Sequence, residues 1–324
     1  MIQLKNINKT FKVSRRNEGF REAAKALFKR NYSIINALDN VSFEINDGEM
    51  VGYIGPNGAG KSSTTKIMSG ILTPDSGECV INGRTPWKDR KNHVRDIGVV
   101  FGQRSQLWWD VPILDSFELI KEIYRIDAGS YSKNLNKLTE LLDIGEIVRT
   151  PARQLSLGQR MRCEIAASLL HSPKILFLDE PTIGLDAVSK VAVRNFIKEI
   201  NREQKTTVIL TTHDMQDIEA LTERIILIGR GRILLDGSLS ELKKRNSRHK
   251  ILIADYGKGS INLIDGMNLL KGMDGHAEIA IDTGILSVSD AIAQISRHAD
   301  ISDISVEGET AEEMVVSLYK EFSI

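Results

Sequence analysis

The chain has 324 residues, of which 41% are hydrophobic and 27% are charged, and its 43 basic residues balance its 43 acidic ones. This length accommodates one large α/β domain and a small second domain. A formal net charge of zero gives no general attraction to nucleic acid, so we expect no nucleic-acid partner. No apolar run approaches the ~20 residues that a membrane-spanning helix requires.

Two features indicate the compartment. Cys79 and Cys163 have neither the spacing of metal ligands nor the number needed for a disulfide framework, which favours a reducing, cytoplasmic setting. Residues 1–5 open an alternating strand pattern and contain no signal-peptide core. If the protein serves a membrane, we expect peripheral association at its cytoplasmic face, with the membrane part supplied by another chain.

The first quarter of the chain predicts an antiparallel edge sheet followed by a strand and a helix. Short strands are expected at residues 4–11 and 41–45. Between them, residues 12–31 form a basic insertion with seven lysines and arginines against two glutamates, in which residues 20–28 have the pattern of a short helix. An apolar strand at 50–54 then leads through a glycine-rich turn into a helix that runs to about residue 72.

The central part alternates apolar strands with helices. This alternation predicts a mostly parallel sheet covered on both faces, with a helical subdomain at about 105–170, in one α/β domain spanning 1–237. The expected strands are 97–101, 175–178, 208–212 and 225–228, and the expected helices are 113–124, 134–142, 160–170 and 189–199.

After residue 237 the composition changes. We expect a polar, basic linker at 238–250 and a small α+β accessory domain at 251–324, with the order strand, strand, helix, strand, helix. The last helix carries a capping box at Thr310 and Glu313, followed by a stripe of apolar residues. No catalytic constellation is evident in this region.

The segment from Gly55 to Ser62 fits the eight-residue phosphate-loop pattern, and it lies between an apolar strand and a helix as that pattern requires. Glycines let the backbone N–H groups turn toward an anion, and the helix N-terminus adds its positive end. Lys61 would reach the β- and γ-phosphates of a nucleoside triphosphate, and Ser62 would hold magnesium. An accidental glycine-rich turn would lack this context. The predicted phosphate-binding residues are Gly55, Pro56, Asn57, Gly58, Ala59, Gly60, Lys61, Ser62 and Ser63.

Polar residues follow three of the predicted strands. Asp179 and Glu180 end the strand at 175–178, where Asp179 would bind magnesium and Glu180 would orient the attacking water. His213 follows the next strand and could contact the γ-phosphate. Gln103 follows the strand at 97–101, and its amide could bind the metal or a water. Each residue alone could be an ordinary strand end, but parallel strands bring them to one sheet edge.

A second motif narrows the class. The run from Leu155 to Arg160, Leu-Ser-Leu-Gly-Gln-Arg, lies about twenty residues before the two acids and opens a helix, and Pro181 to Asp186 follows the acids. In order and spacing this set resembles the ABC ATPase family over roughly residues 1–237. The family signature reads Leu-Ser-Gly-Gly-Gln, so Leu157 departs from it, while Ser156 and Gly158 are retained.

The resemblance implies a second copy of the chain as partner and ATP with Mg²⁺ as ligands. In that family, two subunits associate head-to-tail and sandwich two ATP molecules. Ser156, Gly158 and Gln159 would then contact the nucleotide held by Lys61 and Ser62 of the other copy. ATP would close the dimer and hydrolysis would release it. Asp186 is expected to relay between the two sites.

An aromatic residue stacks on adenine in the family that the chain resembles, and the sequence leaves two candidates. Counting forward from the first strand selects Phe11, and counting back from Ala37 selects Tyr32. The basic insertion separates them. Tyr32 is preferred, and either residue could instead belong to the core.

Further details are similar to ATPases that power type-two ABC exporters, of the branch thought to serve drug, viologen or polysaccharide-type export. They include the Gly229–Arg232 hairpin, the small C-terminal domain and the run Gln103–Asp110. The resemblance implies integral membrane permease subunits as partners. Trp108 and Trp109 could form a socket for such a subunit or belong to the core of the helical subdomain. The insertion at 12–31 could contact anionic lipid or be an exposed loop. The transported substrate is not encoded in this chain.

One alternative is a soluble ABC ATPase that acts on ribosomes or nucleic acid. Such proteins usually carry two ATP domains, long coiled coils or zinc modules, and this sequence has none of them. Another is an ATP-binding switch that hydrolyses poorly, against which the presence of Glu180 and His213 argues. The sequence therefore favours a transport ATPase.

Overall fold

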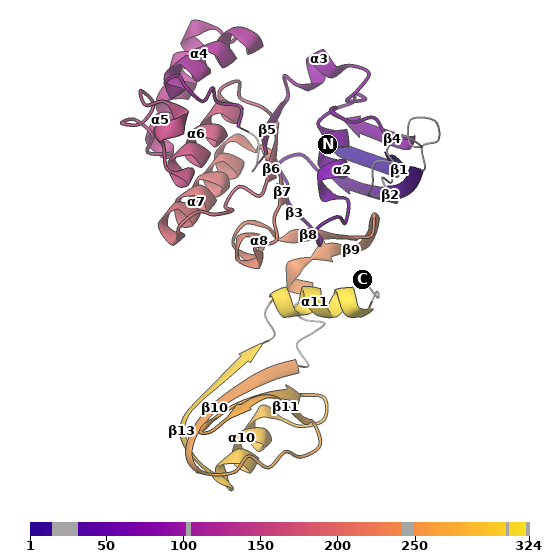
Figure 1. The fold of residues 1–324 in the computed structure, drawn as a ribbon, viewed down its shortest axis with the longest axis vertical. Helices are drawn as coiled ribbons and strands as arrows, with labels where there is room; N and C mark the ends of the chain where they lie inside the picture. Colours follow the sequence, from indigo (N-terminus) through magenta and orange to yellow (C-terminus); the bar gives the residue numbers. More distant parts are fainter. Residues whose placement is uncertain (15–31, 102–104, 242–248, 309–310, 322–324) are drawn as a thin grey trace, which may run out of the picture. The chain divides into compact units, whose positions relative to one another are not determined.

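The computed structural model describes residues 1–14, 32–101, 105–241, 249–308 and 311–321 (Figure 1). The chain divides into two compact units, Met1–Asp236 and Gly237–Ile324.

A six-stranded sheet forms the centre of the first unit, with the strand order β5-β6-β7-β3-β8-β9. The pairs β5–β6, β6–β7, β7–β3 and β3–β8 are parallel. Its central strands are buried on both faces, as Phe177 and Val208 at 0% exposure illustrate. The predicted parallel α/β fold is confirmed. The strands are β3 (Met50–Ile54), β5 (Ile97–Phe101), β6 (Ile175–Asp179), β7 (Thr207–Thr211), β8 (Arg224–Gly229) and β9 (Arg232–Ser238).

The first unit also contains seven described α-helices, of which α4, α5 and α6 lie together as one group (Figure 1). Between α5 and α6 lies a short 3-10 helix, Ala152–Gln154. Asp127 caps α5, which therefore begins six residues before the predicted start. The helix after the glycine-rich turn ends at Met68 rather than near residue 72, because Ile71 N and Leu72 N bond to Lys66 O. The helices are α2 (Lys61–Met68), α3 (Arg90–His93), α4 (Ile113–Tyr124), α5 (Ala128–Leu141), α6 (Leu157–Leu169), α7 (Ala187–Gln204) and α8 (Met215–Leu221).

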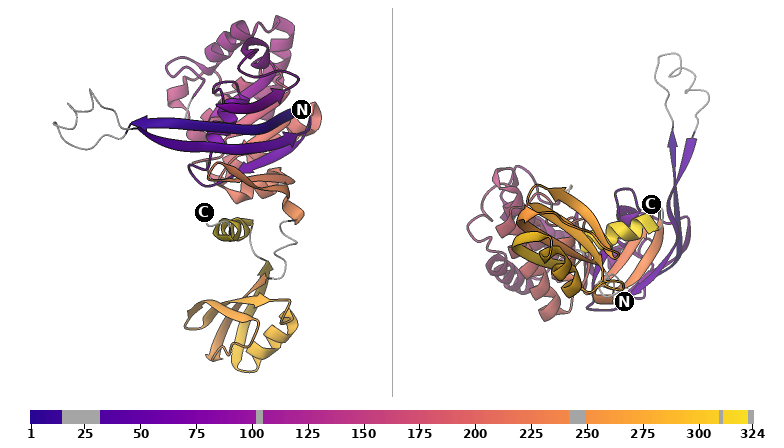
Figure 2. Two further views of the ribbon diagram at one scale, coloured as in Figure 1. Left: turned by 90° about the vertical axis from the view of Figure 1, so that its right-hand side faces the viewer. Right: turned by 90° about the horizontal axis from the view of Figure 1, so that it is seen from below.

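The predicted antiparallel edge sheet is present with the order β2-β1-β4. β1 (Ile2–Ser14) and β2 (Tyr32–Ile45) are longer than predicted, and β4 (Ser76–Ile81) pairs with the inner half of β1. The outer ends of β1 and β2 form a two-stranded ribbon (Figure 2). Apolar residues of this ribbon, such as Val13 and Ile34, are exposed. The sequence there therefore lacks the alternation of buried apolar and exposed polar residues that would have predicted the full length of both strands. Most of the basic insertion, residues 15–31 with the predicted helix at 20–28, lies outside the described residues.

The second unit contains a four-stranded antiparallel sheet with the order β11-β12-β10-β13. Leu252, Ile279 and Ile281 form a core with Ala291 and Ile295 of α10. The sequence predicted two strands before this helix, but there are three. The edge strand β11 was missed because only Met267 is buried in it, so it shows no alternation. The elements are β10 (His249–Gly259), β11 (Met267–Met273), β12 (His276–Asp282), α10 (Val288–Ser296), β13 (Ala299–Gly308) and α11 (Ala311–Glu321).

The predicted capping box of the last helix includes Thr310, which lies outside the described residues. Across the described parts of both units, we find no helix with the length and apolar character needed to cross a membrane.

Candidate active site

The candidate site is a cavity of about 560 Å³ at the carboxyl edge of the six-stranded sheet. β6, β7 and β3 are hydrogen-bonded neighbours in that order, so the segments that follow them meet there. They deliver Asp179 and Glu180, His213, and the loop that begins at Gly55. The residues that line the cavity are Ile35, Ala37, Pro56, Asn57, Gly58, Gly60, Lys61, Ser62, Ser63, Lys66, Ile71, Phe101, Asp179, Glu180, Ile183 and His213.

The loop between β3 and α2 turns tightly beside this cavity. Ala59 N donates to Pro56 O at 3.1 Å, and Gly60 is the N-cap of α2 with a φ of +115°. A Cβ at Gly60 would stand 2.7 Å from Ala37 O, so the position requires glycine. In the described chain no side chain caps α2, and no acidic residue lies in its first turn. Its N-terminal N–H groups can therefore receive an anion.

Lys61 is held by its own loop. Its residue is 8% exposed, and Nζ donates to Gly55 O at 2.5 Å and to Pro56 O at 3.3 Å. Burial lowers the pKa of Lys61, while the charges of Glu180 and Asp179 act in the opposite direction. Its carbonyl partners are neutral, whereas a phosphate oxygen would form a stronger, charge-assisted hydrogen bond. The lysine is therefore placed to bind a phosphate in the cavity.

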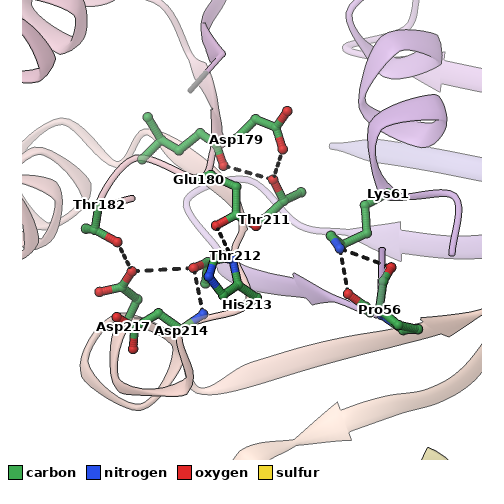
Figure 3. A network of polar contacts seen from close by, with 12 residues as sticks. Pro56, Lys61, Asp179, Glu180, Thr182, Thr211, Thr212, His213, Asp214 and Asp217 are labelled. Atoms are coloured by element: carbon green, nitrogen blue, oxygen red, sulfur yellow. Dashed lines mark hydrogen bonds and ion pairs between the residues drawn. The ribbon is translucent and has the colours of Figure 1, made fainter. Parts of the chain in front are cut away.

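β7 positions the two acids that end β6 (Figure 3). Thr211 Oγ1 donates a hydrogen bond to Asp179 Oδ1, and Thr211 O accepts one from Glu180 N at 2.8 Å. Glu180 has a φ of +55°, in the left-handed region that residues other than glycine seldom adopt. Such conformations persist where surrounding contacts impose them, and they are frequent at active sites. Here the contacts with β7 hold Glu180 at the cavity wall.

His213 completes this wall. Its Nδ1 lies 2.9 Å from Glu180 Oε2, and both residues line the cavity (Figure 3). The imidazole is 64% exposed, whereas the Glu180 side chain is 21% exposed. The histidine therefore holds the carboxylate on one side while keeping access to a ligand. A carboxylate so held can accept a proton from a water molecule.

The donor set fits a magnesium ion. Mg²⁺ is bound in proteins through one or two carboxylates together with hydroxyl, water and phosphate oxygens. Ser62 and Asp179 line the same cavity and are the residues that would hold the ion. Gln103, predicted as a third contributor, lies outside the described residues.

Residues 155–160 of the second motif form a separate cluster at the start of α6, and none of these six lines the cavity. Ser156 is the N-cap, and a reciprocal capping box joins it to Gln159, with distances of 2.9 and 3.2 Å. Leu157, which departs from the family pattern, is 38% exposed. Its Cδ2 stands 2.7 Å from where a Cβ at Gly184 would lie, so it occupies space that this glycine leaves open. Leu157 in place of the usual glycine therefore leaves the Ser156–Gln159 capping box of α6 intact.

Asp186 belongs to this second cluster. It caps α7, accepting hydrogen bonds from Ser189 N at 2.9 Å and Ser189 Oγ at 2.8 Å, and these bonds lower the pKa of Asp186. A Cβ at Gly158 would lie 2.6 Å from Ser189 Oγ, so a larger residue there would displace the Ser189 side chain at this close contact between α6 and α7. The structure thus brings Ser156, Gly158 and Asp186 together.

Neither predicted adenine-stacking residue lines the cavity; Ile35 of β2 does. Phe11 is paired directly with Ile35, so the two side chains share one face of the ribbon. Tyr32 lies three positions from Ile35, on the opposite face, and is 54% exposed. Phe11 thus shares the strand face of the cavity-lining Ile35, whereas Tyr32, the residue preferred from the sequence, lies on the other face; the adenine contact itself stays a prediction.

Sequence reasoning missed several contributors. Ile35 and Ala37 lack the aromatic ring expected of an adenine contact, although their spacing of two puts them on one strand face. Ile183 and Lys66 also line the cavity. Thr211, which holds Asp179, is the last residue of a buried strand and carried no separate signal.

Comparisons with known proteins agree with this arrangement. A family model described as "ABC transporter" matches residues 38–183. The daunorubicin resistance ATP-binding protein DrrA3 of Streptomyces coeruleorubidus is 31% identical over 76% of this chain and 77% of its own length. The probable sulfate/thiosulfate import ATP-binding protein CysA of Chlorella vulgaris is 33% identical over 66% of this chain and 89% of its own length. The chain therefore belongs to the ABC transporter ATP-binding proteins, a family of ATPases.

A solved structure and a longer relative complete the comparison. The dimeric, post-hydrolysis state of the ATP-binding cassette MJ0796, bound to ADP and Pi, matches with a TM-score of 0.61 and 29% identity. The match covers 74% of this chain and 99% of that one. The ABC transporter A family member 8 of Dictyostelium discoideum is 33% identical, but this chain spans only 26% of its length.

Replacing Lys61 should weaken nucleotide binding itself. Lys61→Ala removes the buried ammonium, and a hydrogen bond to a charged group contributes about 1.5–3 kcal/mol, so we expect affinity for MgATP to fall about 10- to 100-fold. Isothermal titration calorimetry measures the change. Lys121→Ala, on the helical subdomain, is the control and should bind as the wild type does. Unchanged affinity in Lys61→Ala would refute the phosphate-binding role.

Proposed function

We propose that two copies of this chain bind two ATP molecules head-to-tail and hydrolyse them, and that this cycle drives transport through separate membrane subunits. Each site would combine the cavity of one copy with the start of α6 from the other. The observation that carries this proposal is the separation of the two clusters within one subunit. Ser156 and Gly158 begin a helix whose N-terminus suits an anion, yet they do not line the cavity that holds Lys61.

The dimeric arrangement is supported by the structural relative. MJ0796 is dimeric in its ADP- and Pi-bound state. The contact of Gly158 with Ser189 adds a second argument, because it places the start of α6 beside Asp186 at the start of α7. A nucleotide that touches Ser156 from the partner's side would therefore act on both helices.

The chemistry follows from the cavity residues. The α2 N-terminus and Lys61 would bind the β- and γ-phosphates, with Ser62 and Asp179 holding the magnesium ion. When bound, the ion would neutralise phosphate charge that develops during hydrolysis. Glu180 would accept the proton of the attacking water, and His213 would fix the carboxylate and contact the γ-phosphate. Gln103 keeps its proposed place beside the metal and the water.

The γ-phosphate of each ATP would link the two copies of the dimer, because both would bind it. Before hydrolysis, the Lys61 site of one copy and the Ser156 site of the other both bind it, which favours the closed state. Cleavage and release of phosphate remove the contact across the interface, and the dimer opens. Asp186, next to Gly158, would transmit the state of one site to the other.

The base would rest against the ribbon formed by β1 and β2. Ile35 lines the cavity, and Phe11 lies beside it on the same face. Adenine would contact these two side chains, since an aromatic ring and a branched apolar chain both suit the face of a base. Tyr32 points to the other side of the ribbon and is not part of this proposal.

Blocking the water-orienting carboxylate should separate binding from hydrolysis. Glu180→Gln keeps the side-chain volume but removes the base, so we expect ATP binding to persist while turnover falls about 100- to 10,000-fold. Size-exclusion chromatography with MgATP should show a stable dimer, and phosphate release gives the rate. The double variant Lys61→Ala/Glu180→Gln is the control and should not dimerise. Near-normal turnover in Glu180→Gln would contradict the assignment.

We propose that the chain serves an exporter at the cytoplasmic face of a membrane. Support comes from its resemblance to type-two exporter ATPases and from its likeness to DrrA3, although the similar CysA is named for import. Trp108 and Trp109, 60% and 50% exposed, are too open for the core placement considered from the sequence. The Arg160 guanidinium lies 5.3 Å from the Trp109 ring. A permease subunit that contacts this pair would therefore touch α6.

Removing one tryptophan should weaken retention by membrane subunits. Tagged wild-type chain, purified from detergent-solubilised membranes of its source cells, should carry an integral membrane protein with it. Trp108→Ala should reduce that yield because it removes exposed apolar contact area, whereas Ile123→Ala should not, although Ile123 is similarly exposed at 65%. Mass spectrometry of the eluate measures both. A wild-type chain that elutes with ribosomes and never with a membrane protein would contradict the transport role.

A further inference from the structure

We propose that Asp217 is a positioning residue that ties the loop after Glu180 to the segment before His213, so that the two catalytic side chains are held as one unit. This proposal rests on the function proposed above and adds a residue to its machinery. Asp217 lies on α8 and is 0% exposed. It does not line the nucleotide cavity.

Two threonines converge on this carboxylate from different loops. Thr182 Oγ1 donates a hydrogen bond to Asp217 Oδ2, and Thr212 Oγ1 lies 3.5 Å from the same oxygen. Thr182 comes two residues after Glu180, and Thr212 comes directly before His213. The threonines are 2% and 1% exposed, so water does not compete for these bonds. Figure 3 shows the dashed contacts that join Thr182 and Thr212 to Asp217, to the left of the Glu180–His213 pair.

The other carboxylate oxygen of Asp217 is bound by α7. Arg194 Nε donates to Asp217 Oδ1 at 2.6 Å, so the carboxylate has a charged partner on one side and hydroxyl donors on the other. Lys190, also on α7, donates to Asp214 Oδ2 at 2.5 Å, while Asp214 N donates to Thr212 Oγ1 at 3.0 Å. The Thr212–Asp214 segment is therefore fixed from both sides.

This arrangement explains how an exposed pair keeps its geometry. The direct contact between His213 and Glu180 involves a largely exposed imidazole, and such a contact gains little on its own. The buried contacts of Asp217 fix the backbone just after Glu180, through Thr182, and the backbone just before His213, through Thr212. Thr182 also belongs to the loop that ends at Asp186, so the same carboxylate joins the hydrolysing side chains to the loop proposed to report on the second site. A small displacement of either side chain could lower the rate greatly.

The test removes one hydroxyl and leaves the buried charges in place. Thr182→Val preserves the volume but deletes the donor to Asp217, and we expect kcat for MgATP to fall up to about 100-fold with KM little changed. Thr182→Ser restores a hydroxyl and should recover most of the rate. Thr222→Val is the matched control, because it deletes the local bond from Thr222 Oγ1 to Ile218 O on the same helix. It should lower thermal stability and leave kcat unchanged.

A double-mutant cycle with Asp217→Asn gives the second readout. If Thr182 acts through Asp217, the combined variant should lose no more activity than Asp217→Asn alone. Wild-type kcat in folded Thr182→Val, or losses that simply add, would overturn the proposal. A wild-type chain that fails to hydrolyse ATP would instead refute the proposed function on which it rests.

Discussion

β6, β7 and β3 lie hydrogen-bonded side by side and parallel, and the rest of the site depends on this arrangement. Each strand ends at the same edge, so residues more than 100 positions apart in sequence, such as Lys61 and Glu180, line one cavity. The strands are buried on both faces, so other parts of the fold pack against each side of them. Thr211 and the buried Asp217 then place the catalytic side chains more finely than the strand ends alone could.

The helical subdomain supplies the second half of the chemistry. Its helix α6 begins with a regular cap at Ser156 and packs closely on α7 through Gly158. Asp186 caps α7 at that contact. The proposed dimer gives a reason for this second helix N-terminus suited to an anion, because the phosphate that it would bind is held by the other copy of the chain. A single interaction, a γ-phosphate bound from two sides, would then couple hydrolysis to movement of the subunits.

The sequence indicated which residues would meet at the candidate site where the proposed chemistry demands special residue types. Most of the phosphate loop, Asp179, Glu180 and His213 were predicted because their types and spacing are restricted, and the structure brings these residues to one cavity, while their roles stay predictions. It predicted poorly where ordinary residues contribute. Ile35 carries no chemical signal, and the outer ribbon and β11 are too exposed to show alternation. Asp217 and its threonines could not be paired in advance, because α8 and the loop after Glu180 meet only in the folded chain.

The most direct test of a shared nucleotide site is complementation between two inactive variants. Lys61→Ala disables the phosphate-binding cavity of the subunit that carries it. Ser156→Arg blocks the start of α6, the part of a subunit that would complete the site of its partner. Neither variant should hydrolyse ATP alone. Mixed in equal amounts, they form heterodimers in which one composite site has an intact Lys61 and an intact Ser156, so phosphate release should reappear. A mixture that forms heterodimers but stays as inactive as its components would contradict the account.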